Sequence, residues 1–195
     1  MPRLTDAQKN ERRERILAGA RRCFARHGYE GATVVRLEAE IGLSRGAIFN
    51  WFPSKEELFI TLAARDNERF HRILVDEGFE GLLEAVLEHE PDWLAVYHEF
   101  GRLLRADPAL RERWTSISSD AAREASLAWI ASGQADGRLR RDVEPEEIGR
   151  FLGLVVDGVV AQRAFGFDAP RTSLVLRLTR DAIRVQGGGE VRVSD

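Results

Sequence analysis

Residues 33–58 read TVVRLEAEIGLSRGAIFNWFPSKEEL, and this stretch decides the fold. Thr33 can cap a helix whose apolar residues, Val34, Leu37 and Ile41, recur at helical spacing. Gly42 can end that helix in a left-handed conformation, and Ser44 can cap the helix that follows. The stretch therefore predicts two short helices that cross steeply at a tight turn, the helix-turn-helix arrangement that reads a DNA major groove.

The second helix of this motif has an inward and an outward face. Ile48 and Phe52 lie four residues apart and are expected to face the core. This turns another set of side chains outward: Arg45, Phe49, Asn50 and Trp51. Asparagine can form a paired contact to adenine, so Asn50 is a candidate for reading bases. Packing between the helices is an alternative role for Phe49 and Trp51, and for Phe49 we favour it.

A third helical signal follows the motif directly. Ser54 and Glu57, three residues apart, form the pattern of a capping box that opens a long amphipathic helix. Lys55 stands at the start of this helix and can reach a phosphate, although it could also be an exposed lysine of the capping turn. Upstream, the sequence predicts a helix from about Asp6 to Arg26.

Composition limits the class of protein. The chain has 195 residues, 44% hydrophobic and 31% charged, which is ordinary for a soluble globular protein. The N-terminus has no apolar run after its charges, so we expect no secretion signal, no membrane partner and a cytoplasmic location. The single cysteine, Cys23, excludes an internal disulfide. A buried apolar role is favoured for it over a reactive thiol.

Charge is unevenly distributed along the chain. Residues 1–55 carry 11 Lys or Arg and 6 Asp or Glu, a balance of +5, whereas the rest carry 18 and 26, a balance of −8. Residues 1–55 are thus a basic part, here called the head, and the remaining residues are an acidic part, called the body. This distribution suits a protein that contacts phosphate through its head alone. A solvated helix surface would give the same pattern.

The rest of the chain is punctuated by glycine and proline into segments of helical length, with no alternating strand pattern. We expect an all-α protein with a helix-turn-helix domain at 1–53. A helical ligand-binding and dimerisation domain follows at 54–186, and a flexible tail at 187–195.

Two apolar helices are expected near 147–164 and 172–185. Such a pair could complete the core of its own chain, but it could also form a four-helix bundle with a twofold copy, and we favour a homodimer. The expected interface residues are Phe151, Leu152, Val155, Val159, Leu174, Leu178 and Ala182.

These motifs resemble the TetR/AcrR family of ligand-responsive transcriptional regulators. The resemblance covers about residues 12–60. It is carried by the stretch from Phe24 to Thr33, by Gly42-Leu43-Ser44, by Gly46, Ile48 and Phe52, and by residues 54–58. Glu38 and Phe49 depart from the alanine and tyrosine usual there, and Phe49 lacks the hydroxyl that would bind phosphate. Residues 21–24 and 44–49 resemble more narrowly the aconitase repressor branch.

The resemblance implies roles for residues of the head. Thr33, Trp51 and Lys55 match positions that touch the DNA backbone, Ala47 and Asn50 match positions that meet base edges, and Arg45 matches both. The complete expected DNA-binding set is Thr33, Arg45, Gly46, Ala47, Phe49, Asn50, Trp51 and Lys55.

Aromatic residues in the body are candidates for an effector site. A cavity lined by aromatic rings and a few polar atoms suits a small molecule, although such rings are more often plain core. The candidates are Trp93, Tyr97, His98, Phe100, Trp114 and Trp129. His71, His89 and His98 lack the spacing of a helical zinc site, so structural roles are favoured and no metal or cofactor is expected.

An enzyme is the competing class, but the chain has no nucleophile elbow, no phosphate-cradling glycine loop and no metal signature. We therefore expect a homodimeric repressor, released from a palindromic operator DNA when a small-molecule effector binds. A dimeric ligand-binding or scaffold protein without specific DNA binding is the alternative.

Overall fold

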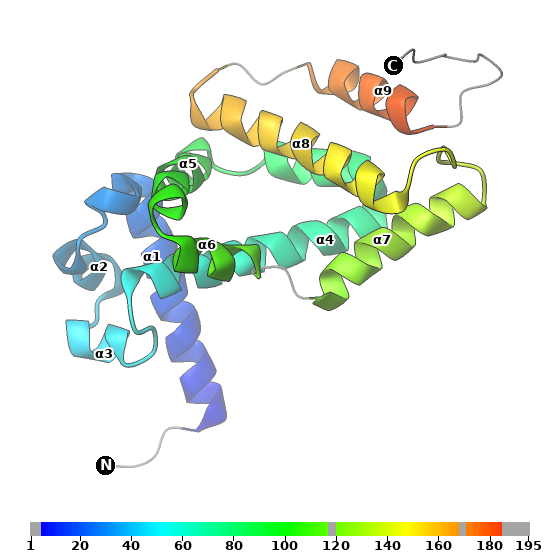
Figure 1. Cartoon of the computed structure of the whole chain (residues 1–195). Helices are drawn as coiled ribbons and strands as arrows, with labels where there is room; N and C mark the ends of the chain where they lie inside the picture. Colours follow the sequence, from blue (N-terminus) through cyan, green and yellow to red (C-terminus); the bar gives the residue numbers. More distant parts are fainter. Residues whose placement is uncertain (1–4, 117–119, 168–170, 185–195) are drawn as a thin grey trace.

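The computed structural model describes residues 5–116, 120–167 and 171–184, and every regular element within these ranges is a helix (Figure 1). The helices are α1 (Asp6–Gly31), α2 (Val34–Ile41), α3 (Arg45–Phe49), α4 (Lys55–Leu87), α5 (Pro91–Ala106), α6 (Pro108–Thr115), α7 (Asp120–Ala135), α8 (Pro145–Ala164) and α9 (Thr172–Ile183). The expected all-α class is confirmed. No helix in this part of the chain is long and apolar enough to cross a membrane.

Helix α1 begins at the predicted residue and breaks near its predicted end. The Thr5 side chain accepts a hydrogen bond from the backbone N–H of Gln8, whose own side chain accepts from the Thr5 backbone, a complete capping box. Gly28 has φ of +69°, which interrupts the helix before it resumes as far as Gly31. The positive φ favours glycine, and a Cβ at this position would lie 2.6 Å from the Glu99 carboxylate, so any other residue would also displace that side chain.

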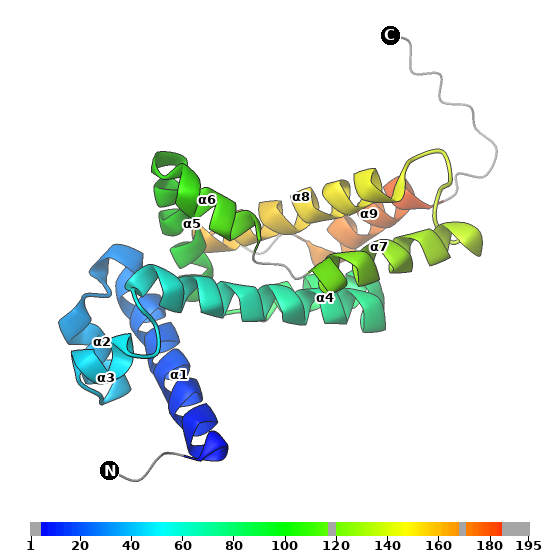
Figure 2. The ribbon, with the colours of Figure 1, turned by 60° about the horizontal axis from the view of Figure 1, so that its bottom comes forward.

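Helix α4 connects the two ends of the molecule. It runs from the head formed by α1–α3 to the far end, where α7, α8 and α9 pack (Figure 2). Gly78, with φ of +75°, breaks the helix at the point where it passes into the second half of the body. Only half of the predicted capping box forms at its start: Ser54 accepts from the N–H of Glu57, but the Glu57 carboxylate pairs with Arg113 of α6.

Two hydrophobic cores lie along α4. The first joins the head to α5 and α6, and it includes the fully buried Cys23 and Phe24 of α1 together with Phe59 of α4. The second joins the far half of α4 to α7, α8 and α9. Packing therefore does not change at residues 53–54, and the domain boundary there stays a prediction. The predicted tail 187–195 lies outside the described residues.

The expected dimer helices form at α8 and α9, but their apolar residues divide between two faces. Leu152 and Val159, which were expected at the dimer interface, are buried in the second core of their own chain. They recur at helical spacing on the stripe that faces the body. Outward-facing apolar residues are Phe151, Leu154, Leu174 and Leu178, while Val155 and Ala182 are half-buried. Leu154 was not among the expected interface residues, although its exposed fraction of 71% is larger than those of Phe151, Leu174 and Leu178.

Candidate nucleic-acid interface

The turn between α2 and α3 forms as the sequence predicts. The Thr33 side chain accepts from the N–H of Arg36, and Ser44 accepts from the N–H of Ala47, so each short helix is capped at its start. Between the helices, Gly42 adopts φ of +70° and donates its N–H to the carbonyl of Glu38 at 2.8 Å. Both helices are anchored inward, with Leu37 and Ile48 completely buried.

Arginines of α1 hold this motif in place. Arg15 donates to the carbonyls of Ile41 (3.2 Å) and Gly42 (3.0 Å), at the end of α2, where carbonyls lack helical partners. Arg22 and Arg26 both pair with the carboxylate of Glu40. Part of the basic charge of the head is therefore used internally, and it is not available to phosphate.

Glu38 has a structural role that the sequence reasoning missed. Its carboxylate accepts the N–H of Arg45, the first residue of α3, at 2.5 Å across the turn. A carboxylate at a helix N-terminus satisfies an unpaired N–H and opposes the positive end of the helix dipole. The departure from the usual alanine thus fixes the start of α3 against the end of α2.

The eight candidate DNA-binding residues lie together around α3 and at the starts of α2 and α4. The exposed ones are Thr33, Arg45, Gly46 and Asn50, and the half-buried ones are Ala47, Phe49, Trp51 and Lys55. Phe49 and Trp51 pack against the first core, so packing is the observed role of both. α3 ends at Phe49, one residue before Asn50, which keeps helical backbone angles as the cap.

Lys55 is half-buried and already has partners. Its ammonium donates to the Tyr29 carbonyl at 2.9 Å and lies 4.3 Å from the centre of the Tyr29 ring. Two of its three N–H donors remain for another acceptor. Lys55 thus joins the start of α4 to the end of α1 while keeping hydrogen-bonding capacity for a phosphate.

Among the described residues, the six aromatic candidates for effector contact lie in three different surroundings. Four of them surround Phe59, with ring centres at 5.6 Å (Trp93), 5.4 Å (Tyr97), 4.5 Å (Phe100) and 6.0 Å (Trp114). They fill the junction between head and body. His98 packs instead against Phe165, and Trp129 lines a separate hollow beside Gly78.

A cavity of about 640 Å³ lies between α4, α7 and α8, and none of those six residues lines it. Its apolar walls include Phe70, Leu74, Ile130 and Val156. Polar groups also face it, among them His71, whose Nδ1 lies 2.6 Å from the Ser126 hydroxyl. Burial lowers the pKa of His71 and so favours the neutral ring. Sequence patterns could not find this cavity, because its walls come from three distant helices.

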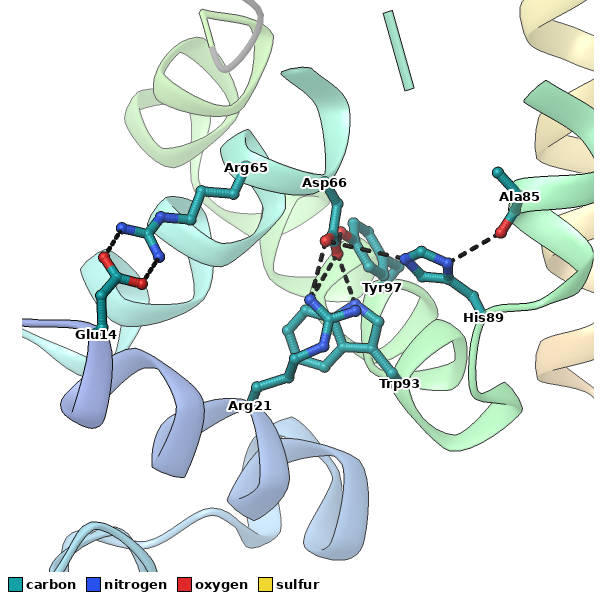
Figure 3. A network of polar contacts seen from close by, with 8 residues as sticks. All are labelled: Glu14, Arg21, Arg65, Asp66, Ala85, His89, Trp93 and Tyr97. Atoms are coloured by element: carbon teal, nitrogen blue, oxygen red, sulfur yellow. Dashed lines mark hydrogen bonds and ion pairs between the residues drawn. The ribbon is translucent and has the colours of Figure 1, made fainter. Parts of the chain in front are cut away.

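Asp66 of α4 is a buried carboxylate at the junction of head and body (Figure 3). Arg21 of α1 donates to both of its oxygens, at 2.9 and 3.1 Å. Trp93 Nε1 and the Tyr97 hydroxyl, both on α5, donate to Oδ2 at 2.8 and 3.1 Å. Arg21 also lies 4.4 Å from the Trp93 ring centre. One carboxylate therefore connects three helices.

This arrangement predicts a loss of stability in acid. Burial alone would raise the pKa of Asp66, but His89, Arg21 and Trp93 together lower it to about 2. A carboxylate whose pKa is lower when folded stabilises the fold above its unfolded pKa of about 3.9. That contribution, about 2 kcal/mol, is lost as the pH falls from about 4 to 2. Urea unfolding at pH 7 and pH 3 should show about half of this loss, ~1 kcal/mol, in the wild type and a smaller one in Asp66→Asn. An equal pH dependence in the two proteins would contradict it.

The capped α2–turn–α3 unit, with Arg45 exposed on α3 and Asn50 exposed at its C-cap, defines a helix-turn-helix protein of the class that binds DNA. Residues 16–62 match the family described as "Bacterial regulatory proteins, tetR family". The HTH-type transcriptional repressor AcnR of Corynebacterium diphtheriae is 39% identical over 94% of this chain and 97% of its own length. The chain therefore belongs to the TetR family of bacterial transcriptional regulators.

Solved structures have the same fold. Salmonella enterica GusR superposes with a TM-score of 0.71 over 93% of this chain and 98% of its own, at 24% identity. A transcriptional regulator from Saccharomonospora viridis in complex with choline gives a TM-score of 0.67 over 89% and 95%, also at 24% identity. Within the described residues, no group of three His, Cys, Asp or Glu side chains could hold a metal ion.

Proposed function

We propose that the protein is a cytoplasmic, homodimeric repressor whose two heads occupy successive major grooves of a palindromic operator. The observation that carries this proposal is the capped helix-turn-helix, with Arg45 and Asn50 exposed on and just after α3. The similarity to AcnR, a repressor, favours repression. The exposed apolar residues of α8 and α9 favour a twofold partner, because two half-sites need two heads.

Within each head, exposed polar groups divide by position into two roles. Thr33 and Lys55, at the starts of α2 and α4, are proposed to bind the phosphate backbone, as is Arg45. Asn50 and Arg45 are proposed to meet base edges, with Ala47 and Gly46 allowing close approach. Trp51 and Phe49 support this surface from behind through their packing on the first core.

Retention of genomic fragments by the purified protein tests DNA binding itself. Specific fragments should be enriched over bulk DNA in the presence of competitor, and the genes beside them would indicate the target. Uniform retention of all fragments, or none, would favour the alternative of a dimeric ligand-binding or scaffold protein.

Asn50→Ala should relax the base preference at one symmetric pair of operator positions. A paired asparagine–adenine contact discriminates by about 1–3 kcal/mol, roughly tenfold to hundredfold per half-site. Because Asn50 is exposed and its backbone N–H already bonds the Gly46 carbonyl, alanine should leave α3 intact. Binding across a library of single-base operator variants measures this effect. Equal weakening on all sequences would mean that Asn50 meets only phosphate or water.

The cavity between α4, α7 and α8 is the proposed effector site. Its apolar walls, together with polar and charged groups such as His71 and Glu146, suit a small molecule, and the regulator from Saccharomonospora viridis was solved with a small molecule, choline. The aromatic cluster at the head–body junction is no longer favoured for ligand contact, because its rings pack on each other.

A variant that fills this cavity tests the effector site. A Cβ at Gly149 would meet Ile130 at an ordinary 3.5 Å, so Gly149→Leu can be accommodated by pointing into the space. Compounds from a metabolite library that release the wild type from its operator should fail to release Gly149→Leu. Equal release of both proteins would place the effector elsewhere.

A further inference from the structure

The cavity and the head–body junction are connected by a short chain of side-chain contacts. Phe70, which lines the cavity, packs its ring on that of His89 at 5.1 Å between centres. The His89 Nε2 faces Asp66 at 3.9 Å from Oδ1. Asp66 in turn holds Arg21 of α1 in the head. Residues of α4, α1 and the α4–α5 connection thus meet in one continuous set of contacts, of which Figure 3 shows the part from His89 to Arg21.

His89 is an unusual member of this chain of contacts. Its ring is buried, and its Nδ1 lies 3.1 Å from the Ala85 carbonyl, but Nε2 has no hydrogen-bond partner within the described residues. The Ala85 carbonyl only accepts, so Nδ1 carries a proton, and Nε2 can donate to Asp66 only when the ring is protonated on both nitrogens. A movement of less than about 1 Å would bring Nε2 of that cationic ring within hydrogen-bonding distance of the carboxylate. The distance between the ring and the Asp66 carboxylate therefore sets the strength of their contact, and a small displacement of the ring would change it.

The Asp66 carboxylate has few ways to absorb such a change. Its two oxygens already accept from Arg21, Trp93 and Tyr97. A hydrogen bond from His89 would draw on Oδ1, one of the two oxygens that Arg21 uses. The position of the His89 ring consequently affects how α1 is held against α4, and α1 carries the arginines that fix the α2–α3 motif.

We propose that Phe70, His89 and Asp66 form the relay by which occupancy of the cavity sets the orientation of the DNA-binding head. Asp66 acts as a positioning residue, since it touches neither DNA nor the cavity. A ligand that displaces Phe70 moves the His89 ring, alters the contact with Asp66 and releases or tightens Arg21. This inference rests on the proposed function, because it assigns the regulation of the same site.

The indole N–H of Trp93 reports the state of Asp66 directly, because it donates to Oδ2. In the ¹H–¹⁵N spectrum of the intact DNA-free dimer, Phe70→Ala should shift the Trp93 indole signal. Leu74→Ala is the matched control, since Leu74 lines the same cavity one turn further along α4. It should leave that signal in place. In a His89→Leu background the shift caused by Phe70→Ala should vanish.

Operator affinity gives the second measurement. Loss of the charge in Asp66→Asn should weaken operator binding roughly 10- to 100-fold, since hydrogen bonds to charged groups contribute about 1.5–3 kcal/mol each. The loss of operator affinity in the double variant Phe70→Ala/Asp66→Asn should be smaller, by a factor of about 3 or more, than the product of the two single losses. Leu74→Ala combined with Asp66→Asn should give the simple product.

The relay and the proposed function can fail independently of each other. If Phe70→Ala moves the Trp93 signal no more than Leu74→Ala does, the relay is overturned whatever the DNA result. The relay is also overturned if the effects of Phe70→Ala and Asp66→Asn on operator affinity multiply. If the spectra behave as expected but the wild type binds no specific DNA, the proposed function fails, while the coupling between cavity and junction stands.

Discussion

Raising the salt concentration from 50 to 200 mM should weaken operator binding roughly 10³-fold. Each head has three cationic side chains around the α2–α3 motif, namely Arg36, Arg45 and Lys55, so a dimer has six. Arg36 and Lys55 each donate to one backbone carbonyl but keep further N–H donors for a phosphate. Each contact with phosphate releases a counterion, which gives a slope of about −5 in a plot of log affinity against log salt. Four further head arginines, Arg15, Arg21, Arg22 and Arg26, are expected to contribute less, because they pair with groups of their own chain.

Lys55→Ala should reduce that slope by roughly 2 for the dimer and weaken all sequences about equally. It also removes the tie from α4 to the Tyr29 carbonyl, so the circular dichroism spectrum and the melting temperature must be measured alongside. Arg138→Ala, an exposed arginine paired with Asp136 in the body, is the matched loss of charge and should leave the slope unchanged. A changed base preference in Lys55→Ala with an unchanged slope would contradict the positioning role.

A charge on the outward face of α8 or α9 should abolish operator binding without any change in the head. Leu154 and Leu178 have exposed fractions of 71% and 60% in the single chain. Exposed leucine side chains on neighbouring helices are unfavourable in water and indicate a surface that another protein chain covers. An unpaired aspartate buried at an interface costs about 3–5 kcal/mol. The dimer dissociation constant of Leu154→Asp or Leu178→Asp should therefore rise roughly 10²- to 10³-fold or more.

Sedimentation velocity and operator binding, measured on the same samples, test this dimer face. Ala131→Asp on the exposed side of α7 adds the same charge away from it and should remain dimeric. An intact dimer for both leucine variants would remove α8 and α9 from the interface. A monomer that still bound the full operator with wild-type affinity would contradict the need for two heads.

Local rules predicted much of the head. The turn at Gly42 and the helix cap at Ser44 could be predicted because backbone conformation and capping depend only on neighbours a few residues away. The break at Gly28 and the burial of Ile48 and Phe52 follow from rules of the same kind. Contacts between residues that are distant in sequence leave no such local pattern. Asp66 in a charged helix suggests a solvated residue, yet its partners lie 45, 27 and 31 residues away.

The same limit explains what the sequence left open in the body. The spacing of Trp93 and Phe100 could indicate either a cavity or a core, and the choice depended on Phe59, which is distant in sequence. For α8, periodicity identified an apolar helix but did not separate the buried Leu152 from the exposed Leu154. Only the packing of α4 and α7 against the helix decides which stripe faces inward.

Hydroxyl-radical footprinting of a retained genomic fragment tests the central claim most directly. Two heads in successive major grooves should protect two patches of backbone related by a twofold axis, with centres about 34 Å or one helical turn apart. The protected sequence should be a palindrome, and the protection should disappear in the monomeric Leu178→Asp variant. A single or asymmetric protected patch, or protection that survives in the monomer, would contradict a twofold dimer that reads DNA through its helix-turn-helix heads.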